Sequence, residues 1–266
     1  MDWVLDGLSA AGDRIYLALN GLSGRSSLLD SLVALAIDNN LVKAAPVAAA
    51  FLFAWHAAPA ARDRSRRVLI ATLLSLLFVL AATKTLADST FVPRPFIHSQ
   101  QTYHLEGERL VETPRLAYRQ PSAGFSHGRY ERLREGEIDD NDLNSFPSDH
   151  AAFFFALALG IFLASRRAGI VAVAWTLVVI CGSRIATGTH SVLDIVAGLA
   201  IGGLILLAVI LTATRWIVRP FDAAAGWTLR HPALSSAGLF LILFEAANTL
   251  ENSREVLRTA KGMLGL

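Results

Sequence analysis

The sequence is short of charge, of lysine and of cysteine. Charged residues make up 17% of its 266 residues, whereas soluble domains average about 25%, which argues against a disordered chain and an ordinary soluble enzyme. The formal net charge is only +2, so no strong field selects nucleic acid or another polyanion as a partner. A single cysteine, Cys181, excludes an intrachain disulfide and a cysteine metal cluster.

What the sequence has instead is long apolar runs, since 53% of its residues are hydrophobic. A helix needs about 20 apolar residues to cross the hydrocarbon core of a bilayer. The runs predict an all-α fold, a polytopic transmembrane helical bundle of five or six spans with amphipathic interfacial helices. The predicted spans are residues 41–59, 67–87, 148–165, 168–182 and 192–214, with a weaker sixth at 234–250.

The pattern divides the chain into three parts. Residues 1–40 form an amphipathic or interfacial segment, which lies at the membrane surface or against other helices. Residues 41–214 form the transmembrane core, from which the polar loop 88–147 projects. Residues 215–266 hold either the sixth span or an interfacial helix, with a surface helix expected over 251–266.

Arginines mark one side of the predicted bundle. They gather in three short connections that all fall on the same side, which the positive-inside rule makes cytoplasmic. The arginine bias and abundant alanine indicate a bacterial source. The prediction is therefore a multi-pass protein of the bacterial cytoplasmic membrane, with loop 88–147 on the periplasmic side. The arginines are Arg62, Arg64, Arg66, Arg67, Arg166, Arg167, Arg215 and Arg219.

Ionisable residues cluster at the opposite ends of the spans. Such residues are costly at membrane depth, so their convergence predicts a functional site. His190 and Asp194 are four residues apart and would share a helix face. A carboxylate that holds one ring nitrogen leaves the other free to act as a nucleophile. The cluster consists of Lys84, Arg94, Ser148, Asp149, His150, Arg184, His190 and Asp194.

Three strings within this cluster resemble the motifs of the type-2 phosphatidic acid phosphatase family. They occur in the family's order, and the resemblance covers roughly residues 67–214. The strings are Arg94-Pro95 for the end of the first motif, Pro147-Ser148-Asp149-His150 for the second, and Ser183-Arg184 with His190 and Asp194 for the third.

The resemblance implies a metal-independent membrane lipid phosphatase without a cofactor. His190 would form a phosphohistidine, His150 would act as acid and then as base, and Asp194 would complete the catalytic set. Arg94 and Arg184 would hold the phosphate oxygens. Ser148, Lys84 and Asp149 would be further residues of the phosphate site. The expected partners are the bilayer and a lipid phosphate. The sequence gives no indication of the oligomeric state.

Two positions depart from the family pattern. Ala87 occupies the place of the lysine in the first motif, and Lys84 lies one turn deeper, where it reaches the site or pairs with Asp88. Asp149 replaces a glycine, a variant that resembles bacterial undecaprenyl-diphosphate phosphatases. Undecaprenyl diphosphate is therefore the first expected substrate, followed by phosphatidate, phosphatidylglycerophosphate and lipid A phosphates.

Three other functions fit parts of the pattern. A non-catalytic lipid-phosphate binder or transporter would keep the pocket without turnover. A vanadate-dependent haloperoxidase shares the phosphate-binding motif, although the predicted spans argue against it. A metal hydrolase would use His150, His190, Asp149 and Asp194, and activity in excess chelator would dismiss it.

Overall fold

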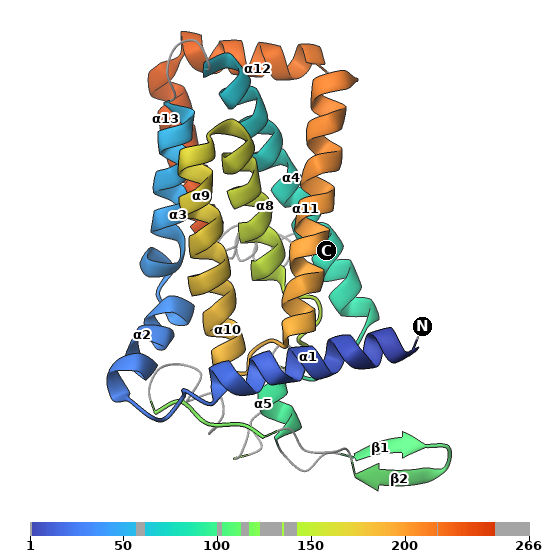
Figure 1. The fold of residues 1–266 in the computed structure, drawn as a ribbon. Helices are drawn as coiled ribbons and strands as arrows, with labels where there is room; N and C mark the ends of the chain where they lie inside the picture. The colour runs from blue at the N-terminus through green and yellow to red at the C-terminus, as the bar shows by residue number, and fades with distance from the viewer. Residues whose placement is uncertain are drawn as a thin grey trace, which may run out of the picture.

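The computed structural model describes residues 2–56, 62–99, 103–112, 117–122, 135, 143–216 and 218–247. It is a helical bundle, which confirms the predicted all-α fold class (Figure 1). One antiparallel hairpin pairs β1 (Tyr103–Glu106) with β2 (Arg109–Glu112). The helices are α1 (Asp2–Asn20), α2 (Ser27–Asp38), α3 (Asn40–Trp55), α4 (Arg62–Ser89), α5 (Pro95–His98), α8 (Asp149–Ala164), α9 (Arg166–Trp175), η2 (Thr176–Cys181), α10 (Gly182–Ala186), α11 (Val192–Arg215), α12 (Val218–Arg230) and α13 (Pro232–Ala247).

Three stretches are long and apolar enough to cross a bilayer, judged by length and composition. They are Arg64–Ser89, Arg166–Ala186 and Val192–Ala213. A fourth candidate is the pair α2 and α3, which is bent by 63° at residue 39. Helices α8 and α13 are apolar but shorter. The predicted count of five or six spans stays a prediction.

Helix α8 lies in the centre of the bundle and packs against α3, α4, α9 and α11. Its residues Phe153 and Ile161 are fully buried, and Phe154 is 1% exposed. A helix that is apolar on every face is stable only when other helices surround it. This explains why α8 has few polar residues after its first turn.

Helices α8 and α11 approach closely at two glycines. A Cβ atom at Gly198 would collide with the main chain of Ser148, and one at Gly202 with the main chain of Ala152. Small residues at this spacing allow helix backbones to come together in membrane bundles. The packing thus holds the start of α11 beside the start of α8, where the charged residues lie.

The outward faces of the long helices are apolar. Phe78 on α4 is 53% exposed, Val178 on η2 is 73% exposed and Leu204 on α11 is 69% exposed. Apolar surface of this extent is typical of a protein that faces lipid.

Helices α1 and α12 cross the two ends of the bundle (Figure 1). Helix α1 packs against α10 and α11 at one end, where the Asn20 side chain donates to Ala186 O at 2.8 Å. Helix α12, which the sequence analysis did not anticipate, crosses the other end. There Asp222 pairs with Arg67, and Thr228 accepts from Arg66 at 2.9 Å. The predicted surface helix over 251–266 and part of loop 88–147 lie outside the described residues.

Candidate active site

Two extended segments, one at residues 92–94 and one at residues 143–145, pair at one end of the bundle and form the base of the site. Arg94 N donates to Leu143 O at 3.1 Å, and Ser145 N donates to Val92 O at 2.8 Å. This pairing places Arg94 beside the segment that leads into α8, although the two are about fifty residues apart in the chain.

Asn144 ties the end of α4 to the same segment. Its Nδ2 donates to Ala87 O at 2.8 Å and to Thr90 O at 2.7 Å. Its Oδ1 accepts from Val92 N at 3.0 Å and Phe146 N at 3.2 Å. One amide side chain therefore satisfies four main-chain groups and sets the position of α4 relative to α8.

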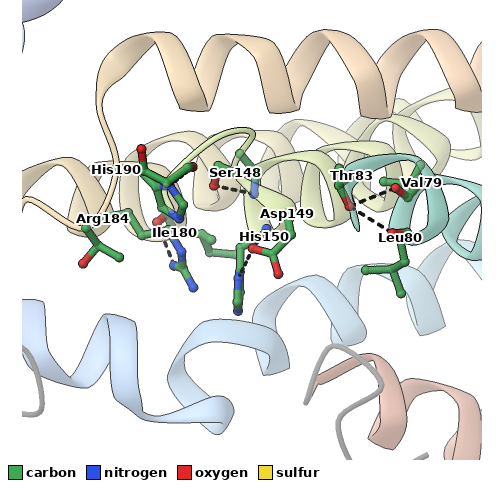
Figure 2. A network of polar contacts seen from close by, with 12 residues as sticks. Val79, Leu80, Thr83, Ser148, Asp149, His150, Ile180, Arg184 and His190 are labelled. Carbon is green, nitrogen blue, oxygen red and sulfur yellow. Dashed lines mark hydrogen bonds and ion pairs between the residues drawn. The ribbon is translucent and has the colours of Figure 1, made fainter. Parts of the chain in front are cut away.

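His190 lies in the turn between α10 and α11 and is 5% exposed (Figure 2). Its Nδ1 is 2.8 Å from the main-chain carbonyl oxygen of Ser145. Because a carbonyl only accepts hydrogen bonds, Nδ1 carries the proton and the neutral ring keeps a lone pair on Nε2. The ring is therefore held in the tautomer that a nucleophilic Nε2 requires.

The charges around His190 favour its neutral form. Burial has the largest effect, and the guanidinium groups of Arg94 and Arg184 add to it, while Asp149 opposes them. Together they hold the pKa of His190 well below its usual range. The ring is therefore neutral and nucleophilic at neutral pH.

Asp194 does not hold the His190 ring in the way that the sequence suggested. Its carboxylate accepts from Ser191 N at 2.7 Å, and its own main-chain N–H contacts Ser191 Oγ at 3.2 Å, which forms a capping box. The physical reason is that His190 precedes the first residue of α11, Val192, so the two side chains do not share a helical face. Asp194 instead fixes the start of α11.

Arg94 and Arg184 are oriented by main-chain carbonyl groups. Arg94 Nη1 donates to Thr189 O at 3.0 Å, and Arg184 Nη1 donates to Ile180 O at 3.0 Å. Arg184 is 4% exposed. A neutral carbonyl fixes the direction of a guanidinium group without cancelling its charge. Both arginines therefore contribute positive charge beside His190.

Asp149 contacts His150, the neighbouring residue. Its Oδ1 lies 2.8 Å from His150 Nδ1 and accepts from His150 N at 2.7 Å. Asp149 also lies within electrostatic reach of Arg184 and His190. The carboxylate that replaces the motif's glycine is thus compensated by cationic and imidazole groups.

Ser148 serves as the N-cap of α8. Its Oγ accepts from Ala151 N at 3.4 Å and the residue is fully buried. Ser148 N also donates to Asp194 O at 3.2 Å, which joins α8 to α11. Its contact with phosphate stays a prediction.

Lys84 lies at the rim of the site. Its Nζ is 3.1 Å from Asp88 Oδ1, and 69% of the side chain is exposed. Both residues line a cavity of about 370 Å³ together with Arg94, Asp149 and His190. Lys84 therefore shares the cavity with the central residues while it pairs with Asp88.

Sequence reasoning missed Ser145 and Asn144. Both act through loop contacts, which show no periodicity and no motif spacing. The only sequence signal that could have indicated them is their position just before Pro147. Within the described part of the chain, no group of three or more His, Cys, Asp and Glu side chains is arranged to hold a metal ion.

Comparison with known proteins gives the family. The PAP2 superfamily profile matches residues 68–217, more than half of the chain. The chain belongs to the PAP2 superfamily. This match confirms the family predicted from the motifs, and it covers α8, α11 and the turn that carries His190.

A curated relative of this PAP2 protein is the bacitracin transport permease protein BcrC of Bacillus licheniformis. The two are 40% identical over 88 residues, which is 32% of this chain and 39% of BcrC. The match therefore spans well under half of the relative's length. No solved structure gave a significant match.

Proposed function

We propose that this PAP2 protein is a membrane lipid phosphatase that removes the terminal phosphate of an isoprenoid diphosphate, with undecaprenyl diphosphate as the first candidate. The observation that carries the proposal is the tautomer of His190. Its Nε2 lone pair is available beside Arg94 and Arg184, at one end of an apolar bundle. Superfamily membership supports the same class of reaction.

In the first step, the Nε2 lone pair of His190 forms a bond to the terminal phosphorus. The bond between that phosphorus and the lipid-side oxygen breaks, and its electron pair stays on the oxygen. His150 donates a proton to the leaving oxygen. Arg94 and Arg184 stabilise the charge on the other phosphate oxygens.

In the second step, water hydrolyses the phosphohistidine. His150, now neutral, takes a proton from the water while the water oxygen bonds to phosphorus. The bond from phosphorus to His190 breaks, which returns the lone pair to Nε2 and releases inorganic phosphate.

Asp149 orients His150 for both steps. Its carboxylate accepts from Nδ1 at 2.8 Å, so Nε2 is the ring atom that exchanges a proton with substrate and water. Asp149 is therefore a positioning residue and not a phosphate ligand.

The direct test is phosphate release by the purified protein in detergent. His190→Ala should lower turnover by about 1,000-fold or more, because it removes the nucleophile. His231→Ala is the matched control, since His231 is an exposed histidine just after α12, at the other end. Equal activity in wild type and His190→Ala would refute the mechanism.

A trapping experiment tests the covalent step. Substrate labelled in the terminal phosphate, quenched in alkali, should leave acid-labile label on wild type and none on His190→Ala. Label that persists in the variant would assign the nucleophile to another residue. Full turnover in excess chelator is also expected, because the proposed steps use no metal.

The substrate panel consists of undecaprenyl diphosphate, phosphatidate, phosphatidylglycerophosphate and a lipid A phosphate. Undecaprenyl diphosphate is the first candidate, and the other three lipids are the alternatives. All four are measured in the same detergent at the same molar ratio of lipid to detergent, and the lipid with the highest kcat/KM is identified as the substrate.

The second candidate is a lipid-phosphate binder or transporter, which the word permease in the name of the BcrC relative favours. Such a protein would bind lipid phosphate through the same arginines without releasing phosphate. Saturable binding without turnover in wild type would establish it. Phosphate release above that of His190→Ala would dismiss it.

The site is proposed to face the periplasm. The arginine-bearing starts of α4 and α9 and the end of α11 lie at the opposite end of the bundle (Figure 1). In a Cys181→Ser background, Glu106→Cys in the hairpin should react with an impermeant maleimide in intact cells, and Arg167→Cys should not. The reverse pattern would invert the orientation.

A further inference from the structure

The His190 turn, residues 186–189, precedes the proposed nucleophile and is held from outside by its main-chain carbonyl groups. Each of the four carbonyl oxygens accepts a hydrogen bond from a different segment of the chain. The donors to residues 186, 187, 188 and 189 are, in order, Asn20 Nδ2 at 2.8 Å, Tyr118 Oη at 3.3 Å, Phe96 N at 3.1 Å and Arg94 Nη1 at 3.0 Å.

The amide groups near this turn bond in the opposite direction. The N–H groups of residues 187–190 donate back to carbonyl oxygens of α10, at Ser183, Arg184 and Ile185. These bonds fix the local shape of the turn but not its place in the bundle. Its place therefore depends on the donors that reach it from other segments.

Asn20 is a donor that lies outside every family motif. It is the last residue of α1, it precedes the matched residues 68–217, and it is 2% exposed. Besides its bond to Ala186 O, its Nδ2 donates to Arg119 O at 3.0 Å, and its Oδ1 accepts from Arg119 N at 2.7 Å. A buried amide is costly unless its polar atoms are paired, and here all the partners are main-chain groups of distant segments.

A second side chain near the end of α1 bonds to the same carbonyl group. Ser23 Oγ, which is also buried, donates to Ala186 O at 3.1 Å. A carbonyl oxygen has two lone pairs, so it can accept from both side chains. Helix α1 itself packs against α10 and α11 across this end of the bundle (Figure 1). The N-terminal segment thus holds the start of the turn through two donors.

The N-terminal segment also holds residues 117–122 against the turn. The main chain of Arg119 is bonded to α1, and Asp30 on α2 accepts from Ser122 N at 3.0 Å and from Ser122 Oγ at 2.6 Å. Tyr118 lies between these two points and donates to the turn. One segment therefore holds the turn both directly and through residues 117–122.

The fit between the turn and Tyr118 is close. Gly188 has a φ of 67°, in the left-handed region that favours glycine. A Cβ atom at Gly188 would lie 2.8 Å from the Tyr118 ring and 3.3 Å from Phe96 N. With so little space on this side, a shift of residues 117–122 would displace the turn as well.

We infer that Asn20 is a positioning residue, which holds the His190 turn in the place from which Nε2 of His190 reaches phosphorus. The inference rests on the proposed phosphatase function. The bond from Nδ1 to Ser145 O orients the ring, while the turn sets the main chain that carries it. A displacement of about 1 Å in a reacting group can lower the rate by about 100-fold.

The test measures kcat and KM of Asn20→Ala with the lipid of the substrate panel that the wild type cleaves best. The expected result is a fall in kcat of about 30-fold with a change in KM of less than about 3-fold. The physical reason is that Ala186 and Arg119, the partners of Asn20, are not among the residues that line the cavity at His190. A kcat equal to that of the wild type, or a rise in KM alone, would overturn the inference.

Asn39→Ala is the matched control. Asn39 also pairs with main-chain groups, since its Oδ1 accepts from Leu41 N at 3.0 Å and from Val42 N at 3.1 Å, but it does so at the start of α3. The lost cap should lower thermal stability and leave kcat within about 2-fold of the wild type. An equal fall in kcat in Asn39→Ala and Asn20→Ala would show a general structural effect and overturn the inference.

Amide hydrogen exchange tests the positioning without turnover. In Asn20→Ala, residues 187–190 should exchange about 10-fold faster or more, while α8 and α11 keep the rates of the wild type. Faster exchange throughout the bundle would indicate a general loss of stability and contradict the inference. If Asn20→Ala does not fold, Ser23→Ala replaces it, because it removes the other side-chain donor to Ala186 O, with an expected fall in kcat of about 3-fold to 10-fold.

The two proposals fail in different ways. A wild type that cleaves no lipid of the panel would refute the proposed phosphatase, and hydrogen exchange then decides whether Asn20 holds the turn. An active wild type, with kcat and exchange at residues 187–190 unchanged in Asn20→Ala, refutes only the role of Asn20.

Discussion

The two ends of the bundle both bury arginine, but they hold it in different ways. At the end crossed by α12, Arg67 pairs with the carboxylate of Asp222, and Arg66 donates to Thr228 and lies 4.9 Å from the centre of the Trp55 ring. At the site end, Arg94 and Arg184 donate to main-chain carbonyl groups, and the Asp149 carboxylate lies within electrostatic reach of Arg184. A carboxylate offsets the positive charge of arginine, whereas a carbonyl orients it. The same residue type thus pairs with a carboxylate at one end and is oriented by main-chain carbonyl groups beside His190 at the other.

The largest expected effect follows from this difference. Arg184→Gln should lower kcat/KM by about 100-fold to 1,000-fold, because an oriented charge on the transferring phosphate is lost. Arg67→Gln should change kcat/KM by less than about 3-fold while it lowers thermal stability. The measurements are phosphate release and thermal unfolding in detergent. Similar falls in kcat/KM in both variants would show that the arginines at the two ends do not differ in their contribution to catalysis.

The carboxylates give a second comparison. Asp149→Asn should lower kcat by about 10-fold to 100-fold with little change in KM, because His150 loses the carboxylate that accepts from its Nδ1 and orients the ring. Asp222→Asn should leave kcat unchanged. A rise in KM alone for Asp149→Asn would indicate instead that Asp149 contributes to substrate binding.

The packing of α11 can be tested with two glycines. Gly202→Ala should destabilise the protein by about 2 kcal/mol, because the added Cβ meets the main chain of α8 at Ala152. Gly226→Ala, in α12, meets no atom within 4 Å and should be neutral or stabilise by about 0.5 kcal/mol. Unfolding in detergent measures both. Equal stability of the two variants would show that the close approach is not needed.

The smallest expected effect concerns pH. His190 must be neutral to attack, and burial with Arg94 and Arg184 lowers its pKa, so the acid limb of kcat/KM should lie well below pH 6.5. Removing one of these positive charges raises the pKa of His190, so the residual activity of Arg94→Gln should have its acid limb at higher pH. If the acid limb of kcat/KM lies at the same pH in Arg94→Gln as in the wild type, it reports the titration of a group other than His190.

The sequence anticipated the family, and the candidate site residues that it named converge at one end of the bundle. The spacings of Arg184, His190 and Asp194 are local, and motif order follows the chain, so neither needs tertiary information. The role first given to Asp194 was wrong in detail, because spacing assumes one continuous helix and α11 begins only after His190. The capping box is itself a local pattern that the helix boundary reveals.

The residues that were missed come from distant parts of the chain. Ser145 reaches His190 through its main-chain carbonyl group, which every residue has, so no side-chain pattern predicts it. The charge network at α12 likewise depends on packing between distant segments.

The amino-acid sequence by itself determined the apolar character of the long helices, the helical class and the family. These depend on composition and on short spacings, since the bilayer requires apolar helices and phosphate requires fixed cations. Only the tertiary structure decided which ring nitrogen of His190 is free and why the Asp149 carboxylate is tolerated. Each of these is set by the distance between groups on different helices, and that distance exists only once the bundle has packed around α8.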